Sequence, residues 1–295
     1  MTGRLHVALA FDDGFWAPAY AAARSVCIAT TRRADLVFHL LEWQVSAAHR
    51  AELDGLVAEY GAQVVHYPLE GDPTLRDLTA ALPRSRAFPP IVYGRLLLDR
   101  LLPPEVERLV YLDADVLVRA PIEVLLGSDL GGRALGAVAE PGRHRLIAGD
   151  DMRARRGPFD PAEPYFNSGV LLIDRAGWAA ADLPGLLGRL VASGEIGALY
   201  HDQDVLNLAF RGAWTELGFR WNLQKPHPAL KALDPFIVHY TTGFKPWRLL
   251  NYVAFGSTYR HVMTRDLVRR YRRYRWARRF AELRRRLFGP GSGRP

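Results

Sequence analysis

Apolar runs and polar breaks alternate along this chain and predict an alternation of strands and helices. Short apolar runs closed by a polar or turn residue predict buried strands. These runs lie at residues 4–11, 36–41, 63–67, 108–112, 134–139, 170–173 and 236–238. Helix formers between them predict helices at 19–30, 46–60, 91–102, 178–193 and 205–210, with Ser46 and Gly61 suited to cap the second. Such alternation indicates an α/β fold with a mostly parallel sheet.

The strand predicted at 108–112 leads into two carboxylates, Asp113 and Asp115, separated by a single residue, and a second apolar run follows at 116–118. Ionised Asp is rarely buried unless a positive group pairs with it. In open α/β sheets, ligands bind at the carboxyl ends of the strands. We therefore expect both carboxylates to face a cation at that edge of the sheet. A strand that simply runs out into a solvated acidic turn is the alternative.

Other polar side chains also follow predicted strands. Asp12 and Asp13 close the first strand and precede a Gly and a helix, an order that suits a nucleotide pocket but also a simple turn. His239 ends the strand at 236–238, and Lys245, one of only three Lys in an Arg-rich chain, lies in the following loop. A lone Lys there suggests a compact phosphate contact.

The candidate ligands define the kind of metal that the chain favours. Two carboxylates and one imidazole form a mixed oxygen and nitrogen site, which suits Mn²⁺ or a similar divalent ion with open positions for substrate oxygens. No Cys lies in these motifs, so a structural zinc site is not expected. The single cysteine, Cys27, excludes an internal disulfide and fits a reducing compartment.

The net charge of +8 comes from one end of the chain. Residues 260–294 contain thirteen Arg against Asp266 and Glu282, whereas the rest is slightly acidic. We therefore divide the chain into a body, residues 1–258, and an Arg-rich arm, residues 259–295. Apolar residues on two offset helical faces predict two short amphipathic helices with a break near Arg275.

The arm is typical of segments that bind anionic lipid surfaces, because its polar face is basic and its apolar face is aromatic. RNA binding and docking on a partner helix are the alternatives. We find no run of about 20 apolar residues that would span a membrane. The N-terminal apolar run is also too short for a signal peptide, and acidic residues follow it too early.

The segment 140–164 is rich in Arg, Pro and Gly and is too long for a routine connection. Loops of this length are usually lids or binding loops. A disordered surface insertion is the alternative.

Six motifs, in order, resemble those of glycosyltransferase family 8, whose members include bacterial lipopolysaccharide galactosyl- and glucosyltransferases and the glycogenins. They are Ala10-Phe11-Asp12-Asp13, Tyr93-Gly94-Arg95-Leu96, Tyr111-Leu112-Asp113-Ala114-Asp115, Tyr165-Phe166-Asn167-Ser168-Gly169-Val170-Leu171, Asp202-Gln203-Asp204-Val205-Leu206-Asn207, and His239-Tyr240 through Lys245-Pro246-Trp247. Each motif is weak alone, but the ordered set is highly specific. One departure is Thr242, which stands where the family usually has a Gly, with Gly243 following it.

The resemblance implies a GT-A fold, a single Rossmann-like nucleotide-sugar-binding domain followed by C-terminal basic helices. It implies a UDP-sugar donor, Mn²⁺ or else Mg²⁺, and retention of anomeric configuration. In this family pattern Asp113 and Asp115 of the D-x-D motif and His239 hold the metal. Donor-binding roles fall to Asp12, Asp13, Arg95, Asn167, Asp202, Gly243 and Lys245. Gln203 and Asp202 would lie at the reacting carbon.

The resemblance therefore predicts a metal-dependent hexosyltransferase that moves galactose or glucose to a lipopolysaccharide or another surface-glycan acceptor. We expect a cytoplasmic enzyme, peripheral on the inner face of the membrane through residues 260–288, with no nucleic-acid partner. Two alternatives remain: a phosphatase of the haloacid dehalogenase type, which also uses Asp-x-Asp, and a non-catalytic nucleotide-sugar-binding protein. The phosphatase would need another acidic pair, for which Asp150-Asp151 is the candidate, but Leu117 stands where that family has Thr or Val.

Overall fold

A seven-stranded sheet forms the centre of the protein, with strand order β3-β2-β1-β4-β7-β6-β8. The structure is a computed structural model that describes residues 3–80, 82, 89–140, 159, 163–198, 201–248 and 251–288. The strands are β1 (Leu5–Asp12), β2 (Leu36–Trp43), β3 (Gln63–Pro68), β4 (Arg108–Asp113), β6 (Leu135–Ala139), β7 (Phe166–Asp174) and β8 (Trp214–Glu216). Only β7 runs antiparallel to its neighbours. The predicted α/β fold with a mostly parallel sheet is confirmed.

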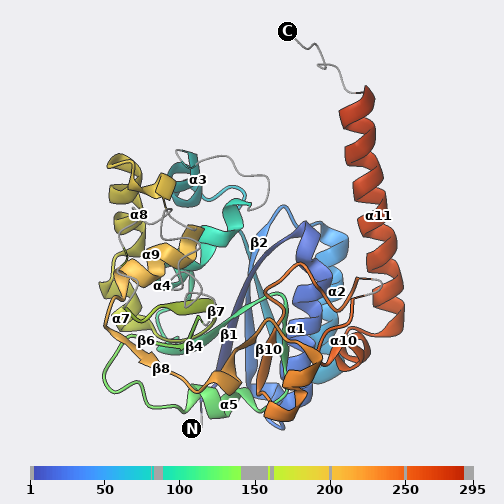
Figure 1. Ribbon diagram of the computed structural model, residues 1–295, viewed down its shortest axis with the longest axis horizontal. Helices are drawn as coiled ribbons and strands as arrows, with labels where there is room; N and C mark the ends of the chain where they lie inside the picture. Colours follow the sequence, from blue (N-terminus) through green and yellow to red (C-terminus); the bar gives the residue numbers. More distant parts are fainter. Residues whose placement is uncertain are drawn as a thin grey trace.

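Helices cover both faces of this sheet (Figure 1). One layer contains α1 (Trp16–Ala29), α2 (Ala47–Tyr60), α5 (Ile122–Leu126), α10 (Gly256–Val262) and α11 (Arg265–Phe288). The other contains α3 (Pro73–Ala80), α4 (Leu98–Leu101), α7 (Arg175–Ala180), α8 (Leu183–Ala192) and α9 (His201–Ala209). Successive side chains of a strand point to opposite faces. Accordingly Val110 and Leu112 enter the first core, and Leu109 and Tyr111 the second.

The strand expected to end in Asp113-Ala114-Asp115 is confirmed as β4, and the apolar run that follows it belongs to a small second sheet. β4 ends at Asp113, the chain turns at Ala114 and Asp115, and β5 (Val116–Val118) then pairs with β10 (Ile237–His239) and through it with β9 (Leu223–Gln224). The turn occurs because the chain leaves one sheet for the other between the two carboxylates. Both carboxylates therefore lie at the junction of the two sheets.

Local signals predicted some helix ends well. The Ser46 hydroxyl accepts a hydrogen bond from the His49 N–H, and Gly61 has a φ of 71°, so both expected caps of α2 are confirmed.

The helix expected over 91–102 is wrong in type: Pro90–Leu97 form a 3₁₀ helix that continues into α4. Gly94 weakens an α-helix here, and the space beside its Cα is filled by Ile91 and Leu69. The helix expected over 178–193 is likewise divided into α7 and α8.

The C-terminal arm is one long helix after a short one, so the predicted break near Arg275 is wrong. α11 is continuous, and the bend lies before it, where Thr264 has a φ of 64°. Leu267 and Tyr271 are buried in the core of the body, whereas Trp276 and Phe280 are exposed. One apolar face of this helix therefore packs on the body, and the other is exposed to solvent. The far end of the helix extends past the body (Figure 1).

The boundary at residue 258 stays a prediction, although α10 and the start of α11 contribute to the core of the body. No helix in the described ranges combines the length and apolar character needed to cross a membrane. Most of the loop 140–164, namely 141–158 and 160–162, lies outside the described residues, as does the pair Asp150-Asp151. Their predicted roles therefore stay predictions.

Because only the first part of α11 packs on the body, a Leu→Ala substitution should affect stability differently at two positions of this helix. Leu267→Ala removes a side chain that is 2% exposed, and should lower the free energy of unfolding by roughly 2–5 kcal/mol. Leu283→Ala, on the same helix but 51% exposed, should change it by less than about 0.5 kcal/mol. Urea unfolding measures both values. Equal small effects would mean that α11 does not pack on the body.

Candidate functional site

The candidate site lies where β1 and β4 end, beside the start of the antiparallel strand β7. The register pairs Leu112 of β4 with Val170 of β7, which brings the Asn167-Ser168-Gly169 segment next to the two carboxylates. His239 pairs with Val116 across the small sheet. Segments far apart in the sequence therefore meet at the carboxyl edge of the large sheet, as expected for ligand sites in this fold class.

Asp113, Asp115 and His239 converge as the sequence predicts. One ligand atom from each lies within 4.8 Å of the others. The Nε2 atom of His239 is 3.1 Å from Asp115 Oδ1 and 3.5 Å from Asp113 Oδ2. Two carboxylate oxygens and one imidazole nitrogen at these separations fit a divalent metal ion that keeps further positions open for other ligands.

An amide network fixes the ring of His239. Its Nδ1 donates a hydrogen bond to Asn222 Oδ1 at 3.0 Å, which leaves Nε2 as the atom that faces the carboxylates. The Asn222 amide in turn donates to Asn167 Oδ1 at 2.9 Å. Gly169 leaves room for the ring, because a Cβ there would lie 2.0 Å from His239 Cε1. The imidazole is therefore held in one orientation from two sides.

Arg95 and Lys245 balance the charge of the two carboxylates. The guanidinium of Arg95, which is 6% exposed, donates to Asp113 Oδ1 at 3.0 Å, and Lys245 Nζ donates to Asp115 Oδ2 at 2.5 Å. Burial alone would raise the pKa of each Asp. Arg95 and His239 outweigh this effect at Asp113, and His239 and Lys245 do so at Asp115, so both pKa values lie below the ordinary range.

The same charges act on His239 in the opposite direction. Burial alone would lower the pKa of His239, but Asp115 and Asp113 raise it to about 9. The imidazole therefore carries a proton at neutral pH when the carboxylates have no other cation beside them. A metal ion bound there must displace this proton, since a coordinating imidazole is neutral.

The first turn of α9 closes the site on another side. Gln203 Oε1 accepts hydrogen bonds from the Ser168 N–H at 3.1 Å and from Asn167 Nδ2 at 3.2 Å. The carboxylate of Asp202 lies 2.9 Å from Arg95 Nε, although the contact is not angled as a hydrogen bond. Burial outweighs the Arg95 charge and raises the pKa of Asp202 to about 6. Asp202 and Gln203 are thus fixed to β7 and to Arg95.

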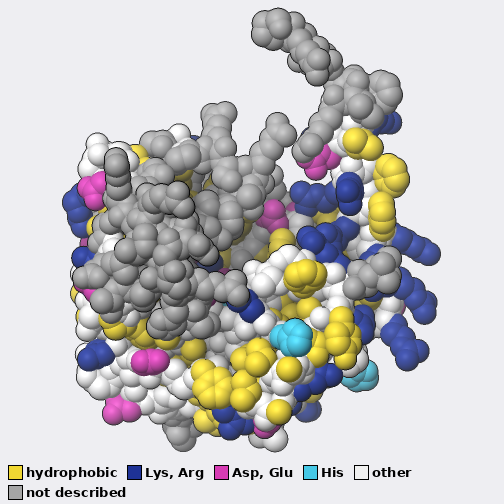
Figure 2. All heavy atoms as spheres, viewed as in Figure 1, with side chains coloured by type: hydrophobic (Ala, Val, Ile, Leu, Met, Phe, Trp, Pro, Cys, Tyr) yellow, Lys and Arg dark blue, Asp and Glu magenta, His cyan; other side chains and the backbone are white. Residues whose placement is uncertain are grey.

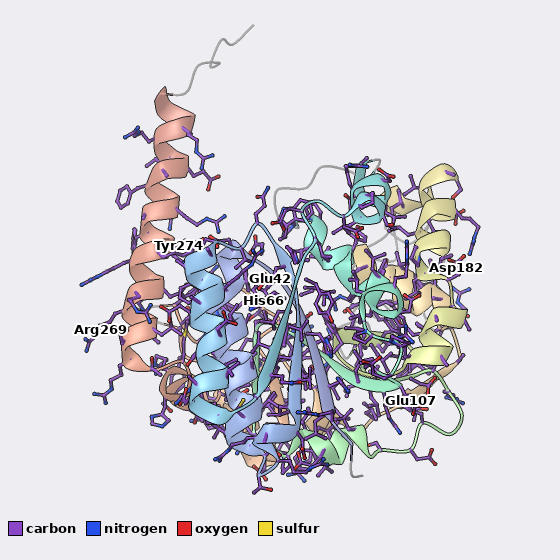
Figure 3. All side chains as sticks on the ribbon, turned by 180° about the vertical axis from the view of Figure 1, so that it is seen from behind. Glu42, His66, Glu107, Asp182, Arg269 and Tyr274 are labelled. Carbon is purple, nitrogen blue, oxygen red and sulfur yellow. The ribbon has the colours of Figure 1, made fainter. Side chains whose placement is uncertain are left out.

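Asp12 and Asp13 end β1 and meet the C-terminal helix. Asp13 accepts hydrogen bonds from Tyr274 at 2.6 Å and from His49 at 2.6 Å, and Tyr271 donates to the Gly14 carbonyl at 2.7 Å. Figure 3 shows Tyr274 on the side of α11 toward α1 and α2. Asp12 Oδ1 is buried without a hydrogen-bond partner among the described residues, and burial raises the pKa of Asp12.

The structure brings together most of the residues selected from the sequence. Asp113, Asp115, His239, Lys245, Arg95, Asp202, Gln203 and Asn167 form one continuous network. Gly243 is on the loop before Lys245, and its carbonyl accepts a hydrogen bond from Arg248. Sequence reasoning missed Asn222 and Tyr274, because neither lies at a strand end or in a recognisable motif.

Comparisons with known proteins identify the family. The profile of glycosyl transferase family 8 matches residues 6–250, so the chain belongs to that family. A crystal structure of the galactosyltransferase LgtC in complex with donor and acceptor sugar analogues has a TM-score of 0.73 and 25% identity, over 88% of this chain and 95% of that one. The expected GT-A fold is therefore confirmed. Membership in family 8 also removes the support for a phosphatase of the haloacid dehalogenase type.

Two relatives come from Escherichia coli K12. A lipopolysaccharide 1,2-glucosyltransferase is 30% identical over 58% of this chain and 53% of its own length. The lipopolysaccharide glucosyltransferase WaaO is 27% identical over 72% of this chain and 63% of its own length. The chain thus spans about half of the first relative and under two thirds of the second.

The space at Gly169 predicts a specific loss of metal binding. Gly169→Ala places a methyl group against His239 and Asp113, and should weaken divalent metal binding at least tenfold by moving the imidazole. Gly188→Ala is the matched control, because nothing lies within 4 Å of its added Cβ. Calorimetric titration with MnCl₂ measures both. Unchanged affinity in the Gly169 variant would exclude His239 as a ligand.

The raised pKa of Asp202 predicts how stability changes with pH. The folded state holds this proton to about pH 6, whereas an unfolded Asp loses it near pH ~3.9. The free energy of unfolding should therefore fall as the pH rises from about 4 to about 6, by on the order of 1–2 kcal/mol. Asp202→Asn should flatten this part of the profile. Identical slopes for both proteins, from urea unfolding at several pH values, would contradict the assignment.

Proposed function

We propose that this protein is a Mn²⁺-dependent, retaining glycosyltransferase that moves galactose or glucose from a UDP-sugar to a lipopolysaccharide or another surface glycan. One observation carries the proposal: Asp113, Asp115 and His239 converge beside Lys245 at the carboxyl edge of the sheet. Family membership and the lipopolysaccharide glucosyltransferase activities of the two relatives support the reaction class and the acceptor.

The charges of the site suit a leaving diphosphate. Asp113, Asp115 and His239 would hold a divalent ion, which would supply Lewis-acid stabilisation of the diphosphate charge. Lys245 lies against Asp115, so its ammonium group can shift to a diphosphate oxygen and neutralise developing charge. Asp12, with its unpartnered oxygen, and Asp13 would bind the base or ribose at the end of β1, and Gly243 would let the phosphates approach the loop.

The other side of the site suits the transferred sugar. Arg95, Asn167 and Asp202 present polar groups that can bind sugar hydroxyls, and Gln203 would lie near the anomeric carbon. Gln203 is a poor nucleophile, and its Oε1 atom already accepts hydrogen bonds from β7. Retention therefore proceeds either by front-face attack of the acceptor or through Asp202 as a nucleophile.

The arm suggests where the enzyme works. Its exposed Arg, Trp and Phe side chains suit an anionic membrane surface, where a growing glycolipid acceptor would be available. We propose that the enzyme is cytoplasmic and peripheral on the inner face of the membrane.

A screen of UDP-sugars for metal-dependent release of UDP tests the reaction. UDP-galactose or UDP-glucose should give slow hydrolysis with MnCl₂ and none with EDTA. Asp115→Asn should reduce this rate at least 100-fold, because it removes a metal ligand and the partner of Lys245. Asp77→Asn, at an exposed position, should leave it unchanged. UDP binding without turnover of any UDP-sugar would instead support a non-catalytic binding protein.

A further inference from the structure

A large basic cavity lies at the base of α11 and shares no lining residue with the site described above. Its volume is about 840 Å³, within the range of small-molecule sites. It is formed where α1, α10 and the first turns of α11 meet. The lining residues are Arg24, Ser257, Arg260, His261, Thr264, Arg265, Val268, Arg269 and Arg272.

Among the described residues, the lining is positively charged and contains no carboxylate. Arg24 has an acidic partner, Glu59, but the other four Arg of the lining form no ion pair within the described part of the chain. Backbone carbonyls fix two of them: Arg260 donates to Pro246 O at 3.2 Å and Arg272 to Trp247 O at 3.2 Å. These contacts hold the guanidinium groups in place, and the other N–H donors of Arg260 and Arg272 have no hydrogen-bond acceptor among the described residues.

A second cavity of about 290 Å³ shares Arg272 with the first. It is lined by Trp247, Arg248, Arg272, Arg275, Trp276 and Arg279. Burial, together with the charges of Arg248 and Arg279, lowers the pKa of Arg275. The guanidinium groups of this cavity therefore repel one another, which costs free energy. A bound anion would offset this repulsion.

We propose that these two cavities form a binding site for the phosphate-bearing headgroup of an anionic lipid. Arg suits phosphate because its planar N–H donors bind two oxygens at once. A headgroup with a phosphomonoester offers more charge and more acceptor oxygens than a phosphodiester, so it fits several Arg better. The proposal deepens the membrane association proposed above and requires no turnover.

The neighbouring apolar residues favour a lipid over free phosphate. Trp276 lines the second cavity and is 53% exposed, and its ring lies 6.0 Å from that of Phe280, which is 64% exposed. Leu283 continues this stripe one turn further. Figure 2 shows basic side chains gathered along α11, all of them Arg, with hydrophobic side chains exposed beyond them. An acyl chain that leaves the cavity would contact this apolar stripe. A soluble phosphate has no apolar group that could do so.

Vesicle co-sedimentation of the full chain tests the proposal. The probes are phosphatidylcholine vesicles that contain phosphatidic acid, and vesicles of equal surface charge that contain phosphatidylglycerol. The wild type should bind the phosphatidic acid vesicles at least fivefold more tightly. The double variant Arg265→Gln/Arg269→Gln should lose this preference. The matched control Arg273→Gln/Arg284→Gln removes the same charge from α11 outside both cavities, and should keep the preference.

Three results would overturn the proposal. The first is equal affinity of the wild type for the two kinds of vesicle. The second is an equal loss of preference in both double variants, which would indicate a diffuse charge effect. The third is displacement from vesicles by micromolar inorganic pyrophosphate, which would indicate a site for free phosphate. UDP release by the same folded variants should be unchanged, so a failed lipid site is distinguishable from a failed glycosyltransferase assignment.

Discussion

Two partly buried carboxylates, one residue apart, impose the main constraint on this structure. Asp113 and Asp115 cannot both stay ionised side by side and partly removed from water without positive charge beside them. Arg95, Lys245 and His239 supply it, each from a different part of the chain. The chain turns between the two sheets at this point, so the fold brings these groups together where the charge is needed. A divalent ion held there would satisfy the same constraint and would leave Lys245 free for the proposed contact with a substrate phosphate.

The rest of the site serves to hold that arrangement still. The amide chain from Gln203 through Asn167 and Asn222 to the His239 ring joins α9, β7 and the small sheet without any further charge. On the other side, α11 reaches the end of β1 through Tyr274. The same helix therefore borders both the proposed donor pocket and the basic cavities. The first half of the arm is thus packed against the body beside the proposed donor pocket.

The fold and the centre of the site could be predicted from sequence because both depend on local signals. Polar residues at strand ends mark one edge of a parallel sheet, and this rule located Asp113, Asp115 and His239. The rule fails for contacts that depend on tertiary packing. Tyr274 donates to Asp13 across 261 residues, and nothing local marks it as a partner. The continuity of α11 could not be predicted for the same reason. Two offset apolar faces are compatible with one helix only if the body covers one of them, and the sequence does not show that contact.

Pulsed electron paramagnetic resonance of Mn²⁺ bound in the presence of UDP shows most directly whether His239 holds the metal. Coupling of the manganese spin to a ¹⁴N nucleus reports a coordinated imidazole. We expect one bound Mn²⁺ with such coupling, which disappears in His239→Gln while the protein stays folded. If Mn²⁺ binds to the wild type without nitrogen coupling, or if the coupling survives the substitution, His239 is not a metal ligand.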